Sequence, residues 1–102
     1  MTGDQITEEQ KSIIGNIQFR YGWALIRSMK DIDLGIEMMM EADTYLYGNF
    51  DLKIKIAQIL YQEKQDTKNG MFYVQEALTV KPNDPEALIL KGKMHIREKD
   101  GE

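Results

Sequence analysis

The sequence predicts an all-α fold of antiparallel helix pairs, arranged as two tandem repeats with flanking helices, about six helices in total. Three observations support this fold class. Helix start and stop signals divide almost the whole chain. The alternation and β-branched clusters typical of a sheet are sparse before the only two prolines, Pro82 and Pro85. Residues of similar size also recur 35 positions apart, which indicates an internal repeat.

The first half of the chain carries clear helix boundaries. Thr7 and Gln10 have the spacing of a capping box, in which each side chain satisfies an orphan backbone donor. The pair "GN" at Gly15 and Asn16 offers a stop and a new N-cap, so we expect one helix to end there and another to begin. With Asp31 as the next N-cap, the expected helices cover about residues 7–14, 17–29 and 31–47.

The second half is divided in the same way. The pair "GN" recurs at residues 48 and 49, and Asp66 or Thr67 can cap the helix that follows. Pro82 closes that helix, and "NDPEAL" places Asp84 at an N-cap with Pro85 at the first helical position. The helices expected here cover about residues 50–64, 66–80 and 85–99.

A shift of 35 residues aligns the chain with itself. The aligned pairs keep their size class: Phe19 with Ile54, Gly22 with Ala57, Leu25 with Leu60, Ile26 with Tyr61, Gly35 with Gly70, Met39 with Val74 and Ala42 with Ala77. A period near 35 with two helices per unit is typical of the tetratricopeptide repeat, whose period is about 34 residues. Glycine inside a helix costs about 1 kcal/mol relative to alanine, so we expect close helix crossings at Gly22, Gly35, Gly70 and Gly92.

Length and composition favour one small domain. A chain of 102 residues with 42% hydrophobic residues can build one modest core. We expect residues 1–15 to form an N-terminal arm with a short helix, and residues 16–102 to form the two repeats and a C-terminal capping helix. The net charge of -4 gives no general support for binding nucleic acid, so none is expected as a partner.

The sequence also indicates the kind of cellular compartment. The chain has no cysteine, which excludes disulfides and fits a reducing compartment. No signal peptide or mitochondrial presequence is visible at the start "MTGDQITEEQ". The longest apolar runs, "WALI" and "ALIL", are far shorter than the roughly 20 residues that span a bilayer, so we expect the chain as given to be soluble.

Residues that could perform catalysis are scarce. His95 is the only histidine, and no second ligand or serine partner stands at motif spacing. The acidic pair Asp31 and Asp33 is explained by a helix start, where negative charge is favoured. No glycine-rich phosphate loop is present. We therefore predict no enzyme activity, no cofactor and no metal site.

A binding groove is the functional site that the repeat predicts. In this repeat class the first helix of each unit lines a concave face, at unit positions that here hold Ile17, Arg20, Ala24 and Arg27, then Leu52, Lys55, Ile59 and Gln62. An apolar floor with basic lips at Arg20, Arg27 and Lys55 would suit an acidic amphipathic peptide. An alternative is that Leu52 and Ile59 only pack against neighbouring helices.

The aromatic and methionine residues favour a core role. We expect Phe19, Tyr21 and Trp23 to fill the first repeat instead of forming a ligand cage. The run Met38–Met40 cannot point inward at every position, so one methionine should be exposed, as core filler or as an adaptable contact. An exposed methionine and an apolar groove are also compatible with a homodimer.

The stretch "FRYGWALIRS", residues 19–28, stands at the head of this degenerate repeat pair. Together with "LGIEMMMEA" and "KPNDPEALILKG", it resembles the cytosolic domain of the mitochondrial fission 1 protein family, over about residues 16–100. The resemblance implies an adaptor on the cytosolic face of the outer mitochondrial membrane, often also found on peroxisomes. Members are tail-anchored, and an anchor would follow "KDGE". They recruit a dynamin-related fission GTPase, directly or through its adaptor, by the concave face.

Two other roles remain open for a repeat of this class. One is a generic tetratricopeptide scaffold. The other is a co-chaperone-type module that clamps a C-terminal carboxylate with lysines and asparagines. The positions of that clamp hold Ala24, Ile56 and Glu86 here, so the clamp itself is not present. We expect a role in protein interaction in each case.

Overall fold

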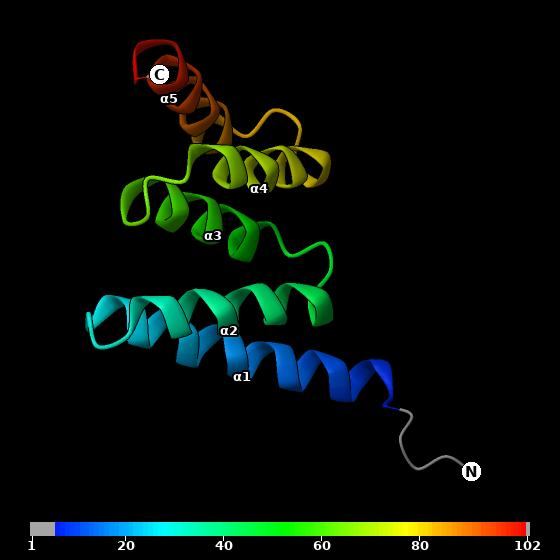
Figure 1. Ribbon diagram of the computed structural model, residues 1–102. Helices are drawn as coiled ribbons and strands as arrows, with labels where there is room; N and C mark the ends of the chain where they lie inside the picture. Colours follow the sequence, from blue (N-terminus) through cyan, green and yellow to red (C-terminus); the bar gives the residue numbers. More distant parts are fainter. Residues whose placement is uncertain (1–5, 102) are drawn as a thin grey trace. The chain divides into compact units, whose positions relative to one another are not determined.

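The computed structural model describes residues 6–101, and this range is all-helical with five helices (Figure 1). In chain order they are α1 (Glu8–Arg27), α2 (Ile32–Tyr45), α3 (Phe50–Gln62), α4 (Thr67–Val80) and α5 (Pro85–Gly101). The helices α1 and α2 form one antiparallel pair, α3 and α4 form another, and α5 packs against α4 and touches α3. The all-α fold of helix pairs predicted from the sequence is confirmed. None of the helices in this range is long and apolar enough to cross a bilayer.

The chain divides into two compact units, the first ending at Tyr47 and the second beginning at Gly48. The first unit holds the pair α1 and α2, and the second holds α3, α4 and α5. The junction falls between the two predicted repeats. Gly48 has a φ of 88°, a left-handed conformation that glycine adopts without a steric penalty, and this allows the chain to turn there.

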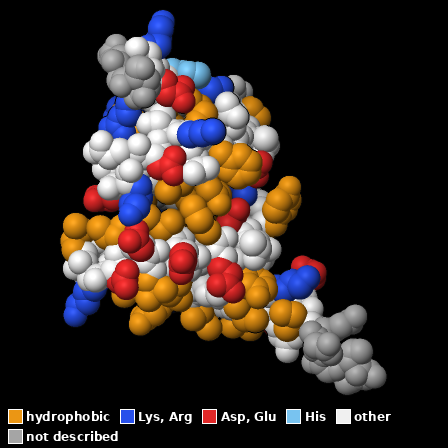
Figure 2. Space-filling view, viewed as in Figure 1, with side chains coloured by type: hydrophobic (Ala, Val, Ile, Leu, Met, Phe, Trp, Pro, Cys, Tyr) orange, Lys and Arg blue, Asp and Glu red, His pale blue; other side chains and the backbone are white. Residues whose placement is uncertain are grey.

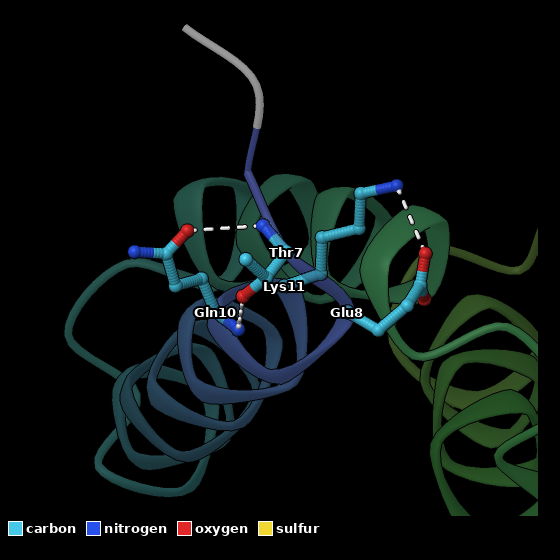
Figure 3. A network of polar contacts seen from close by, with 4 residues as sticks. All are labelled: Thr7, Glu8, Gln10 and Lys11. Atoms are coloured by element: carbon cyan, nitrogen blue, oxygen red, sulfur yellow. Dashed lines mark hydrogen bonds and ion pairs between the residues drawn. The ribbon is translucent and has the colours of Figure 1, made fainter. Parts of the chain in front are cut away.

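Five of the N-caps that the sequence predicts are formed. The Thr7 hydroxyl accepts a hydrogen bond from the Gln10 amide at 3.0 Å, and the Gln10 side chain accepts one from the Thr7 amide at 3.0 Å (Figure 3). An ion pair between Lys11 and Glu8 at 3.4 Å lies beside this capping box. The other four N-caps are Asp31, Asn49, Asp66 and Asp84, which accept from the amides of Leu34, Leu52, Asn69 and Ala87.

The predicted break at Gly15 and Asn16 is wrong, because α1 continues through both residues. A Cβ atom on Gly15 would lie 2.6 Å from the Leu46 Cγ atom, so this glycine allows close packing and does not end the helix. The Asn16 side chain donates to the Ser12 carbonyl at 2.8 Å, inside the helix, and caps nothing. The expected short helix is therefore the first part of α1, and residues 1–5 of the expected arm lie outside the described residues.

The two helix pairs cross at equivalent positions. A Cβ atom on Gly22 would lie 2.7 Å from the Gly35 carbonyl oxygen, so α1 and α2 are in backbone contact there. In the second unit, a Cβ atom on Gly70 would lie 3.4 Å from the Ala57 carbonyl oxygen. Gly22 and Ala57 are 35 residues apart, and so are Gly35 and Gly70, which is the spacing of the repeat found in the sequence. Small residues at these crossings let the paired helices approach closely.

Gly92 departs from this pattern. A Cβ atom built on it would meet nothing within 4 Å, so the close crossing expected at this glycine is not formed. The reason is the face that α5 buries: Ala87, Leu90 and Met94 point into the core of the second unit, and Gly92 lies on another side. The rest of this core is formed by Ile54, Ala57, Val74 and Ala77.

A charged residue is also buried in the second unit. The side chain of Lys53 on α3 is 2% exposed, and its Nζ atom lies 3.6 Å from the Glu76 Oε1 atom on α4. A buried ammonium is tolerated only when charged or polar groups compensate for the lost water. The pair therefore ties α3 to α4 beside their apolar contact.

The aromatic residues of "FRYGWALIRS" are expected to fill the core of the first unit, and this is confirmed in part. Ile26 is buried, and Phe19 and Trp23 are half-buried. The expectation for Tyr21 is wrong, because its side chain is 56% exposed. Helical spacing explains this: Gly22 and Ile26 face α2, and Tyr21 lies on a different side of α1.

The methionine run is more buried than expected. Met39 is fully buried, and both Met38 and Met40 are half-buried. No member of the run is therefore fully exposed.

Candidate functional site

A hollow of about 450 Å³ lies between α3 and α5, within the second unit. We call it the α3–α5 hollow. It is lined from α3 by Gln58, Tyr61 and Gln62, from the start of α5 by Asp84, Pro85 and Glu86, and from the next turns by Ile89, Leu90 and Lys93. One wall therefore carries amide groups, and the other carries two carboxylates, then an apolar surface and an ammonium group.

The helical spacing places these side chains. Gln58 and Gln62 lie four residues apart on α3, and Ile89 and Lys93 lie four residues apart on α5. Residues at this spacing share one face of a helix, so each pair points into the hollow together. Leu90 is buried and forms the apolar base beside them.

Two polar contacts hold the walls together. The Gln58 Nε2 atom donates a hydrogen bond to the Glu86 Oε2 atom at 3.0 Å, which joins α3 to the first turn of α5. At the other end, the Arg97 Nη1 atom donates to the Tyr61 carbonyl oxygen at 2.7 Å. The guanidinium of Arg97 also stacks over the Tyr61 ring. The hollow is therefore bounded by two fixed cross-links between the helices.

Several groups of the hollow remain available to a partner. Within residues 6–101, Gln62 and Lys93 make no hydrogen bond or ion pair, and both side chains are exposed. Ile89 is 59% exposed. The two carboxylates at this site each accept one hydrogen bond, Asp84 from the Ala87 amide and Glu86 from Gln58, and they keep their negative charge. An amide, an ammonium and an apolar side chain thus converge on one hollow.

The predicted groove residues of the first unit lie together. Arg20, Ala24 and Arg27 line an open hollow on α1 with Trp23 and Ser28. Ile17, one turn earlier on the same helix, is 61% exposed. In the described part of the chain, Arg20 and Arg27 form no ion pair, so their charges face solvent.

The predicted groove residues of the second unit are divided. Leu52 is 0% and Ile59 is 5% exposed, so both side chains are buried in this structure. Lys55 is half-buried, and its Nζ atom lies 3.0 Å from the Asp51 carboxylate. Gln62 lines the α3–α5 hollow. The assignment of the whole groove to a partner stays a prediction.

The groove prediction omitted the contribution of α5. Gln58, Ile89 and Lys93 line the hollow but were not among the predicted site residues. Gln58 lies on α3, and Ile89 and Lys93 lie on α5, the helix that begins at Pro85. Counting the same groove positions from Glu86 gives Ala87, Leu90, Met94 and Arg97, of which only Leu90 lines the hollow, so the repeat pattern would not have found Ile89 or Lys93.

No metal centre is formed by the described side chains, among which no group of three or more His, Asp or Glu residues is close enough to hold an ion. His95 is exposed on α5. No protein-family model, no curated protein and no solved structure matches this sequence. The geometry of the α3–α5 hollow and the residues themselves are therefore the basis for a functional proposal.

Proposed function

We propose that this chain is a non-enzymatic adaptor module that binds a linear segment of a partner protein in the α3–α5 hollow. The observation that carries the proposal is the convergence of Ile89, Gln62 and Lys93 on one hollow, each with its functional group available. Peptide grooves combine an apolar contact for an anchor side chain with a few polar groups that fix its orientation.

The residues define the chemistry of the segment. Ile89, with Tyr61 and Leu90 behind it, suits one large apolar side chain. The Gln62 amide can both donate to and accept from the main chain of a peptide. The Lys93 ammonium favours a carboxylate near the apolar anchor. We therefore expect an acidic amphipathic segment, with an apolar residue about one helical turn from a glutamate or aspartate.

A peptide-binding measurement tests this function. The probe is a set of fluorescein-labelled twelve-residue peptides, each with one leucine and with a glutamate three or four positions away, and the readout is fluorescence anisotropy. We expect Ile89→Ala and Lys93→Glu each to weaken binding at least tenfold. Ile96→Ala and Lys99→Glu are matched controls, because both residues lie on α5 outside the hollow. Equal loss with the control variants would contradict the site.

The partner proposed for this adaptor is a dynamin-related fission GTPase or its adaptor protein, at the outer mitochondrial membrane. Support comes from the resemblance of "FRYGWALIRS" and the following repeat to the fission 1 family. Membrane attachment through a C-terminal anchor would raise the local concentration and strengthen weak binding by avidity. Thermophoresis with a purified dynamin-related GTPase tests the partner. Binding of peptides but not of the GTPase would leave a generic helical-repeat scaffold as the function.

A further inference from the structure

The outer side of α1 carries a stripe of exposed apolar side chains. Ile13, Ile17 and Tyr21 are 54%, 61% and 56% exposed. They are spaced four residues apart, which places them on one face of the helix, and Figure 2 shows hydrophobic side chains gathered along α1. Contiguous apolar patches of this kind on a folded surface mark interaction sites. We call these three residues the α1 stripe.

The stripe is symmetric about its central residue. Ile13 and Tyr21 lie four residues before and after Ile17, and both are large and apolar. If a second α1 helix runs antiparallel across the stripe with Ile17 against Ile17, each Ile13 meets a Tyr21 of the other copy. A surface that matches itself in this way is what a two-fold symmetric contact requires.

The charges beside the stripe fit the same arrangement. Glu9 and Arg27 lie 18 residues apart, which is five helical turns, so they stand on the same edge of α1. In an antiparallel helix pair related by a two-fold axis, the edge of α1 that carries Glu9 and Arg27 lies beside the same edge of the other copy. At a rise of about 1.5 Å per residue, Glu9 of one copy then falls within about 3 Å, along the axis, of Arg27 of the other. Within residues 6–101 neither side chain has an ion-pair partner of its own.

We propose that this chain forms a homodimer through the α1 stripe, with the two α1 helices antiparallel and Ile17 at the two-fold axis. The apolar side chains exclude water from the centre of the contact, and the two Glu9–Arg27 pairs set the register and the direction. A contact built on one helix from each copy is smaller than the standard interface of about 1,600 Å², so the dimer is concentration-dependent. The proposal is independent of the α3–α5 hollow.

Cysteine cross-linking tests the register directly, because the chain has no cysteine of its own. Packed helices lie 8–10 Å apart, so facing Cα atoms at the axis are about 5 Å apart, a distance that a disulfide spans. We expect Ile17→Cys to give a disulfide-linked dimer on mild oxidation. Ile13→Cys and Tyr21→Cys should each stay monomeric alone and form a mixed disulfide when combined. A dimer of Ile13→Cys with itself would overturn the antiparallel arrangement.

Association in solution gives the second measurement. Sedimentation over a range of concentrations should show a monomer–dimer equilibrium, and Ile17→Asp should weaken it at least tenfold. Arg27→Glu should weaken it less, and adding Glu9→Arg should restore it by exchanging the charges. Ile96→Asp, an equally exposed isoleucine on α5, is the control. A monomer at every concentration, or a dimer that survives Ile17→Asp, would overturn the proposal, and the first result would leave the stripe to a different protein.

Discussion

The guanidinium of Arg97 lies 3.8 Å from the centre of the Tyr61 ring and donates to the carbonyl oxygen of the same residue at 2.7 Å. Tyr61 is in the last turn of α3, where carbonyl groups lack partners within the helix. A cation is favoured at this end of the helix dipole. One arginine therefore satisfies a helix end, covers an aromatic ring and fixes α5 against α3 where the hollow between them is formed.

The contact predicts a stability difference between two substitutions at Arg97. Arg97→Ala should lower the free energy of unfolding by about 2 kcal/mol, because the ring contact and the charged hydrogen bond are both lost. Arg97→Lys should recover only part of this loss, since an ammonium cannot stack and donate as the planar guanidinium does. Urea unfolding followed by circular dichroism measures both. Full recovery with lysine would show that only the charge matters.

Replacing glycine by alanine is expected to have opposite effects on stability at Gly35 and at Gly92. Gly35→Ala should destabilise by about 1–3 kcal/mol, because its Cβ would lie 2.7 Å from the Gly22 carbonyl oxygen and must push the helices apart. Gly92→Ala should stabilise by about 1 kcal/mol, because the new methyl meets nothing and alanine favours the helix. Thermal unfolding of the two variants provides the measurement. A destabilised Gly92→Ala would mean that α5 has a close contact at this position.

The capping box predicts a local effect at the start of α1. Thr7→Ala should cost about 1 kcal/mol, because the Gln10 amide loses the acceptor that now lies at 3.0 Å. Thr7→Ser keeps the hydroxyl and should be close to neutral. Hydrogen exchange of the first-turn amides reports the change at this helix end. Equal protection in both variants would exclude a role for the hydroxyl.

A charge-reversal pair distinguishes the groove predicted from the sequence from the α3–α5 hollow. Arg20→Glu combined with Lys55→Glu reverses two of the three predicted basic lips, while Lys93→Glu changes only the hollow. We expect the double variant to keep peptide binding and the single variant to lose it. Fluorescence anisotropy with the acidic peptides measures binding, and circular dichroism confirms the fold. Loss of binding in the double variant alone would show that the peptide binds the predicted groove and not the α3–α5 hollow.

Helix boundaries were predictable where they depend on local chemistry. Asp31, Asn49 and Asp84 act as N-caps because a short polar side chain can reach the backbone amide three residues later, whatever the rest of the fold does. The crossing of Gly22 with Gly35 was also predictable, because the 35-residue repeat requires the same small residues at equivalent crossings.

The sequence by itself determined the all-helical class, five of the N-caps and the 35-residue spacing of the helix crossings, since these follow from interactions over a few residues and from periodicity. Tertiary structure alone decided the rest. From sequence alone Gly15 is expected to end a helix, but in the structure it lies inside α1 and packs against Leu46. Tyr21 is expected in the core, but it is exposed because α2 packs on another side of α1. The α3–α5 hollow depends on helices that are distant in the chain, because a shared cavity is a property of packing and no single helix pattern contains it.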